Sequence, residues 1–218
     1  MNPEANGWRN EKIIIKNETY FVEKKSKFQE TNISDRLILA EKLTPLTGKG
    51  FLRFDLMSEE LQQDVANHVV ESPRLTLTRD IKNEIVAFIA SETKIINNQV
   101  IYHLGGIIID PTLQRSGLAK TLLSQEFLET KADILVFRTQ SKKMLGLASK
   151  LATLDAELTR EFAPLFYPEN LDGYINRRVY RGGHSLYEDE NQFQHDAIES
   201  IDWRQGDSLV ACGWIINP

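Results

Sequence analysis

The chain has 218 residues, of which 41% are hydrophobic and 26% are charged, and its formal net charge is −5. This composition predicts a globular protein with one sizeable core, and the acidic balance argues against a protein built mainly to bind nucleic acid. No apolar run approaches the roughly 20 residues that a membrane span needs, and the first residues lack the charged-then-apolar order of a signal peptide. We therefore expect a cytoplasmic protein with no membrane partner.

The first 44 residues are expected to form an N-terminal extension, and residues 45–218 the main domain. Two short apolar runs, KIIIK and TYFVEK, flank Asn17-Glu18 and predict two strands of a hairpin. The run DRLILAEKL that follows fits either a helix or a strand. It is expected to end at Thr44, because Pro45 disfavours helix in the residue before it.

The next part of the main domain predicts one helix and several strands. FLRFDL is expected to be a strand, and Ser58 is expected to cap a helix that runs to about Glu71. Three runs with strand character then follow each other through short turns, namely RLTLTRD, EIVAFIASETKII and QVIYHLGGIII. Connections this short predict an antiparallel meander.

The second half of the chain continues with alternating helices and strands. A helix is predicted after the meander, with four apolar residues on one face: Leu118, Leu122, Leu123 and Phe127. ADILVFRT predicts a buried central strand, Ser141 a second helix, and DSLVACGWII a closing strand. The single cysteine, Cys212, is interpreted as a core residue of that last strand. Residues 163–189 are expected to be irregular, because they are rich in Tyr, Pro and Gly.

The loop DPTLQRSGLAKTLL, between the meander and the first of these helices, has the clearest functional pattern. Pro111 ends the strand because it cannot donate to a ladder, and small residues follow at Gly117 and Ala119. Small residues leave the N–H groups of a helix start uncovered, and these groups together with the helix dipole attract an anion. Arg115 and Lys120 would add positive charge. The loop therefore predicts a site for a phosphorylated ligand, although neither the P-loop nor the dinucleotide fingerprint is present.

The sequence QRSGLA, preceded by a strand and Asp110-Pro111, resembles the Q/R-x-x-G-x-G/A signature of the GNAT acetyltransferase superfamily. The resemblance covers residues 48–160 well and the C-terminal quarter loosely. It implies an α+β fold with a mixed, largely antiparallel central sheet flanked by helices. It also implies an acyl-CoA-dependent N-acyltransferase that transfers acetyl from acetyl-CoA to a primary amine, which attacks the thioester directly.

The resemblance also implies which residues hold the coenzyme. Backbone amides of the loop would bind the pyrophosphate, and the pantetheine arm would pair with the preceding strand. The expected cofactor-binding residues are Ile107, Ile108, Ile109, Gln114, Arg115, Ser116, Gly117, Leu118, Ala119 and Lys120. Lys142 and Lys143 would lie close to the far end of the coenzyme. No metal is expected, because the histidines show no ligand spacing.

The sequence departs from the family pattern at the catalytic positions. Many members carry a Glu on the strand corresponding to QVIYHLGGIII and a Tyr about seven residues into the second helix, where this chain has Ala148. The strand's only side chain with a fitting pKa is His103, which is therefore the candidate base, with a histidine bonded within the sheet as the alternative. Tyr180 is the candidate acid for the leaving thiolate; the other tyrosines of the irregular segment are Tyr167, Tyr174 and Tyr187.

Other functions stay open at this point. A GNAT-fold protein that binds acyl-CoA without catalysis, as a sensor or interaction module, would need neither the Glu nor the Tyr. The basic cluster NRRVYRGG allows RNA binding, although the acidic run YEDE follows it. The negative net charge favours a cationic acceptor such as a polyamine, an aminoglycoside or a lysine-bearing peptide. A homodimer is also left open.

Overall fold

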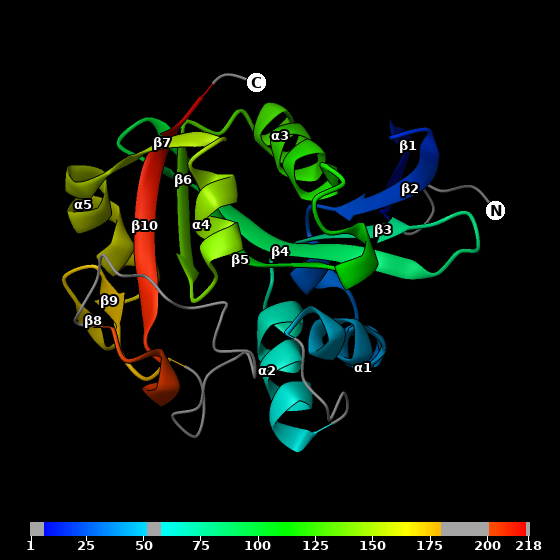
Figure 1. Ribbon diagram of the computed structural model, residues 1–218, viewed down its shortest axis with the longest axis horizontal. Helices are drawn as coiled ribbons and strands as arrows, with labels where there is room; N and C mark the ends of the chain where they lie inside the picture. Colours follow the sequence, from blue (N-terminus) through cyan, green and yellow to red (C-terminus); the bar gives the residue numbers. More distant parts are fainter. Residues whose placement is uncertain (1–6, 52–57, 180–200, 217–218) are drawn as a thin grey trace. The chain divides into compact units, whose positions relative to one another are not determined.

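The computed structural model describes residues 7–51, 58–179 and 201–216 (Figure 1). The chain separates into two compact units, Met1–Glu92 with Gly105–Thr121 and Thr93–Leu104 with Leu122–Pro218. Two long strands, β4 (Ile85–Ile96) and β5 (Gln99–Ile109), begin in one unit and end in the other. Each unit therefore contains its own stretch of β-sheet.

In the first unit the strand order is β1-β2-β3-β4-β5. The first three strands are β1 (Arg9–Ile15), β2 (Glu18–Lys25) and β3 (Arg74–Arg79), and each pairs antiparallel with the next. Lys16 and Asn17 join β1 to β2 with φ angles of 50° and 71°, as a two-residue hairpin turn requires. The predicted N-terminal hairpin is confirmed, and β2 also pairs with β3.

Helix α1 (Ile33–Gly50) runs through Pro45, so the prediction that the segment ends at Thr44 was wrong. Proline removes the bond to the carbonyl four residues earlier, and here that carbonyl belongs to the exposed Glu41. The hydroxyl of Thr44 donates to the carbonyl of Ala40 at 3.0 Å, and that of Thr47 to Leu43 at the same distance. The expected boundary between residues 44 and 45 lies within α1, and the division into an extension and a main domain stays a prediction.

Helix α2 (Glu59–Val70) begins as predicted after Ser58, whose hydroxyl accepts from the amide of Leu61 at 3.3 Å. Its apolar residues Leu61, Val65 and Val69 are buried. The strand predicted for FLRFDL lies outside the described residues, apart from Phe51.

In the second unit the strand order is β4-β5-β6-β10-β9-β8, and β7 also pairs with β10. The strands after β5 are β6 (Ile134–Thr139), β7 (Ala152–Asp155), β8 (Leu171–Asp172), β9 (Ile175–Asn176) and β10 (Ser208–Ile215). β5 and β6 run parallel from Ile101↔Ile134 to Leu104↔Phe137, whereas β10 is antiparallel to all of its partners. The expected α+β architecture with a mixed, largely antiparallel sheet is confirmed.

Three helices accompany these strands: α3 (Leu118–Thr130), α4 (Lys142–Ala148) and α5 (Ala156–Phe166). α3 begins in the first unit, and α4 follows the predicted cap Ser141. The prediction that residues 163–189 are irregular was wrong in part, because α5 continues through Pro164 and β8 and β9 follow it. The side chain of Asp155 fixes the start of α5 by accepting from the amides of Glu157 and Leu158. None of the described helices is long and apolar enough to cross a membrane.

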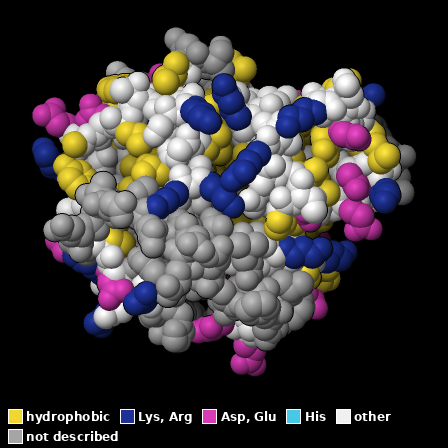
Figure 2. All heavy atoms as spheres, in the orientation of Figure 1, with side chains coloured by type: hydrophobic (Ala, Val, Ile, Leu, Met, Phe, Trp, Pro, Cys, Tyr) yellow, Lys and Arg dark blue, Asp and Glu magenta, His cyan; other side chains and the backbone are white. Residues whose placement is uncertain are grey.

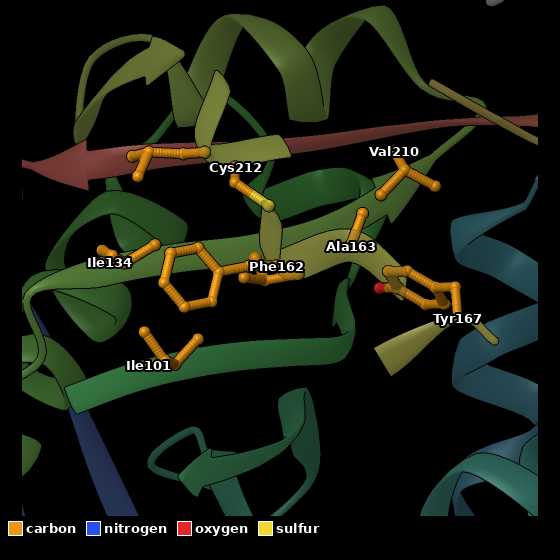
Figure 3. Packing of buried hydrophobic residues seen from close by; sticks show 9 residues of the cluster. Ile101, Ile134, Phe162, Ala163, Tyr167, Val210 and Cys212 are labelled. Atoms are coloured by element: carbon orange, nitrogen blue, oxygen red, sulfur yellow. The ribbon is translucent and has the colours of Figure 1, made fainter. Parts of the chain in front are cut away.

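The core of the second unit lies where α5 packs on β5, β6 and β10 (Figure 3). Its buried residues are Ile101, Ile134, Val136, Leu158, Phe162, Ala163, Tyr167, Val210 and Cys212. Figure 3 shows Tyr167 at the opposite end of this cluster from Ile134. Cys212 is fully buried, and burial raises the pKa of its thiol to about 12. The interpretation of Cys212 as a core residue is confirmed.

Candidate functional site

The loop after β5 starts with a tight turn that leads the chain off the sheet. The amide of Asp110 donates to the carbonyl of Val86 at 2.8 Å, which ties the end of β5 to β4. The carboxylate of Asp110 accepts from the amide and the hydroxyl of Thr112, at 2.9 and 2.6 Å. A single 3-10 turn, Pro111–Leu113, follows. The turn is thus fixed by local bonds that need no ligand.

Gly117 has a backbone conformation that explains why glycine stands at this position. Its φ is 100°, in the region that L-residues rarely adopt, and a Cβ added there would meet no atom within 4 Å. Arg115, two residues earlier, also has a positive φ, of 61°. The chain therefore bends sharply in front of α3 and leaves open space over Gly117.

The first turn of α3 contains backbone N–H groups that have no acceptor within the helix and can donate to a ligand. The first helical bond runs from the amide of Thr121 to the carbonyl of Gly117, at 3.0 Å. A helix has no internal acceptors for its first N–H groups, which here include those of Ala119 and Lys120. The amide of Leu118 donates to the hydroxyl of Ser116 at 3.1 Å, and the amide of Ser116 to the carbonyl of Leu113 at 3.3 Å. Two of the amides expected to bind pyrophosphate thus have acceptors within the loop.

Two further segments of the first unit lie against β5 and its loop. Lys16, in the β1–β2 turn, donates from Nζ to the carbonyl of Arg115 at 3.4 Å. The buried Ile108 packs on α1, where a Cβ added to Gly50 would lie 3.0 Å from its Cγ2 atom. The contact of Lys16 joins residues 99 positions apart, and no sequence pattern indicates it.

The pairing of β5 with β6 stops before either strand ends. The parallel ladder ends at Leu104↔Phe137, while β6 continues to Thr139 and β5 to Ile109. Gly105 and Gly106 follow on β5, and a Cβ added to Gly106 would meet no atom within 4 Å. A side chain at Gly106 would therefore project into open space, next to the segment expected to pair with pantetheine.

His103, in the second unit, is hydrogen-bonded to Tyr167. The ring Nε2 atom of His103 lies 2.8 Å from the hydroxyl of Tyr167, a distance typical of a short hydrogen bond. Tyr167 follows the last residue of α5 and is 6% exposed, whereas His103 is half-buried. The ring of Phe166 also packs against the ring of His103, with centroids 4.8 Å apart. Of the four candidate tyrosines, Tyr167 is thus the one placed against His103, while Tyr180 and Tyr187 lie outside the described residues.

Two cations lie at the ends of the aromatic row formed by Phe166, His103 and Tyr167. The Nζ atom of Lys94, on β4, is 4.6 Å from the ring centroid of Phe166. The guanidinium carbon of Arg138, on β6, is 5.4 Å from the ring centroid of Tyr167. The row and its cations come from three strands (β4, β5 and β6), from α5 and from the residue after it, which is why local sequence patterns did not reveal them.

Tyr174 makes a separate contact with α5. Arg160 donates from Nε to the hydroxyl of Tyr174 at 3.1 Å, and its guanidinium carbon lies 6.0 Å from the centre of that ring. Tyr174 also lines an open pocket of about 500 Å³ in the second unit. Neither His103 nor Tyr167 lines that pocket, so it belongs to a different part of the unit.

One of the arginines in the basic cluster NRRVYRGG is bound internally. Arg177 donates to the buried carboxylate of Asp207 at 2.7 Å and to that of Asp172 at 3.0 Å. Burial alone would raise the pKa of Asp207, but hydrogen bonds from Arg177 and from the amides of Arg178 and Asp202 outweigh it and lower that pKa. The hydrogen bonds to Asp207 and Asp172 raise the pKa of Arg177. This arginine therefore stabilises the turn after β9.

Basic side chains also gather near α4 on the face drawn in Figure 2. Lys142 and Lys143 form the first turn of α4, and Lys143 is exposed. Within the described ranges, no group of three or more His, Cys, Asp or Glu side chains is placed to hold a metal ion.

No family model and no curated protein matches the sequence. The similarities found are to solved structures. The ribosomal-protein-S18-alanine N-acetyltransferase from Escherichia coli has 14% identity over 89% of this chain and 94% of its own, with a TM-score of 0.47. Aminoglycoside 6'-acetyltransferase type Ii has 10% identity, 86% and 96% coverage, and a TM-score of 0.45. The GNAT domain of S. lividans PAT has 11% identity, 67% and 89% coverage, and a TM-score of 0.45. All three scores lie below 0.5, so the case for a function rests on the residues of this chain.

Proposed function

We propose that this protein is an acyl-CoA-dependent N-acyltransferase of the GNAT type, with acetyl-CoA as the acyl donor and a primary amine as the acceptor. The observation that carries the proposal is the loop between β5 and α3, where the left-handed Gly117 leaves open space in front of a helix start. The early end of the parallel β5–β6 ladder is a second supporting feature, because residues 107–109 of β5 lie beyond the last β6 pair and can pair with the pantetheine arm.

In this proposal the pyrophosphate binds to the amides of Gly117, Ala119 and Lys120. The helix dipole and the side chains of Arg115 and Lys120 add positive potential there. The pantetheine arm pairs with residues 107–109 of β5, beside the open space at Gly106. The amides of Ser116 and Leu118 serve mainly to hold the shape of the loop, since both already donate within it.

The reaction moves one proton from the amine to the departing thiolate. The amine nitrogen attacks the thioester carbonyl carbon, a C–N bond forms, and the C–S bond breaks. His103 is proposed to accept the proton of the amine, and Tyr167 to supply the proton for the thiolate. The 2.8 Å bond between these side chains supports this role for Tyr167 in place of Tyr180, because a proton can pass between hydrogen-bonded partners.

A turnover assay tests the proposal. The purified protein is mixed with acetyl-CoA and a panel of primary amines, free CoA thiol is measured, and mass spectrometry identifies the acetylated amine. We expect thiol release that depends on the amine and is absent in a Gly117→Glu variant. Binding of CoA without amine-dependent release would favour the alternative of a sensor or interaction module. Absence of CoA binding would overturn both functions.

A further inference from the structure

The charges around His103 and Tyr167 bear on the kind of amine that can approach them. The aromatic row places a lysine ammonium against Phe166 at one end and an arginine guanidinium against Tyr167 at the other. Arg138 is half-buried and Tyr167 is buried, so water screens the charge of this guanidinium less than it screens the charge of the exposed Lys94. A negatively charged group of an acceptor is therefore attracted most strongly to the guanidinium end of the row.

The guanidinium of Arg138 is held in place by neighbours on two sides. Besides its contact with the ring of Tyr167, its Nη1 atom lies 3.5 Å from the Oδ1 atom of Asn176. Asn176 is buried, and its amide nitrogen donates to the carbonyl of Glu169 at 2.8 Å, which fixes the orientation of the side chain. A positioned guanidinium presents parallel N–H donors that match the two oxygens of a carboxylate.

We propose that the acceptor is a primary amine that also carries a carboxylate, as in a free amino acid, and that Arg138 binds this carboxylate. The inference rests on the proposed acyltransferase function and names the substrate class of the same site. Binding the carboxylate at Arg138 places the amine of the same small molecule near Tyr167 and His103.

The chemical step is unchanged by this choice of acceptor. The neutral amine attacks the acyl carbon, the amide forms, and the CoA thiolate leaves and takes up a proton. The carboxylate makes no bond to the acyl group, so Arg138 acts as a residue that binds and positions the substrate. Its loss should therefore raise KM for amino acids much more than KM for amines that lack a carboxylate.

The first experiment needs no variant. Free-thiol release is measured for the wild-type protein with acetyl-CoA and matched acceptors: amino acids, their carboxamides, the corresponding decarboxylated amines, and phosphoethanolamine. We expect kcat/KM for the best amino acid to exceed that of its carboxamide by about tenfold or more, because the carboxamide lacks the charge that pairs with the guanidinium. Equal rates for an amino acid and its carboxamide, or a preference for phosphoethanolamine, would overturn the inference and leave the acyltransferase function standing.

Variants then locate the carboxylate. Arg138→Gln should remove most of the preference for amino acids over carboxamides, and Arg138→Lys should restore part of it. Arg160→Gln is the matched control, because Arg160 also lies against a tyrosine ring of the second unit. The control should keep the wild-type preference. If Arg138→Gln keeps the wild-type preference for amino acids over carboxamides, another residue binds the carboxylate, and the proposed role of Arg138 is refuted. If wild-type protein binds no CoA, the proposed function itself fails.

Discussion

Replacing Tyr167 by Phe deletes one hydroxyl and keeps the ring that packs in the core of the second unit. The hydroxyl lies 2.8 Å from Nε2 of His103, and the side chain of Tyr167 is 6% exposed. A typical intramolecular hydrogen bond contributes about 0.5–1.5 kcal/mol to the free energy of unfolding. Because His103 is half-buried, water can replace part of the lost bond. We therefore expect the melting temperature to fall by about 2–4 °C for a chain of this length.

The kinetic effect of the same change should be much larger. Loss of a group that transfers a proton in the rate-limiting step lowers kcat by about 10²–10⁴-fold, which corresponds to roughly 3 kcal/mol or more. We expect a decrease of this size in kcat for Tyr167→Phe, measured by free-thiol release at saturating acetyl-CoA and amine. A structural role alone would leave kcat close to that of the wild type.

Tyr174→Phe is the matched control for this experiment. Tyr174 also accepts a hydrogen bond through its hydroxyl, from Arg160 at 3.1 Å, but it has no contact with the aromatic row in the described structure. We expect its kcat to equal that of the wild type. If Tyr167→Phe also retains wild-type kcat, Tyr167 is not the proton donor, and Tyr180 or water would take its place.

Three further predictions concern the loop, the base and the buried thiol. Gly117→Glu should abolish CoA binding in isothermal titration, because it fills and negatively charges the open space; undiminished affinity in a folded variant would contradict the proposed loop. His103→Ala should lower kcat/KM by about 10²-fold or more and remove the acidic limb of the pH profile, since a base acts in its unprotonated form; an unchanged profile would make His103 structural. With a folded-state pKa of about 12, the thiol of Cys212 stays protonated in the native state, whereas the thiol of the unfolded chain ionises near pH 8.5. The contribution of this thiol to the free energy of unfolding is therefore fully present below about pH 8.5 and is lost as the pH rises above it. When denaturant unfolding is measured at pH 8 and pH 10, the free energy of unfolding should fall less between these two values in Cys212→Ala than in the wild type. Equal decreases in the two proteins would show that ionisation of Cys212 does not cause the loss.

Much of the local structure follows from the sequence because its signals are local. Ser58 and Ser141 cap helices as predicted, since a hydroxyl before a helix can bond the amide three residues later. Asn97 and Asn98 adopt positive φ angles of 52° and 62°, as expected for the turn between β4 and β5. The same holds for Gly117, whose conformation agrees with the interpretation of the loop.

The remaining features depend on residues that are distant in the chain. The partner of His103 lies 64 residues away, at the end of a helix whose inner proline, Pro164, had indicated irregular structure. The predicted end of α1 at Pro45 was wrong for a related reason. The burial of one face of that helix stabilises it by more than the loss of one backbone hydrogen bond destabilises it. The position of Arg138 beside Tyr167 likewise results from packing between α5 and the sheet, which no local pattern encodes.

A crystal structure of the protein with CoA bound tests the central claim most directly. We predict that the pyrophosphate accepts hydrogen bonds from the amides of Gly117, Ala119 and Lys120, and that the pantetheine arm lies along residues 107–109 of β5. Coenzyme bound at any other place, with the loop between β5 and α3 empty, would contradict the account.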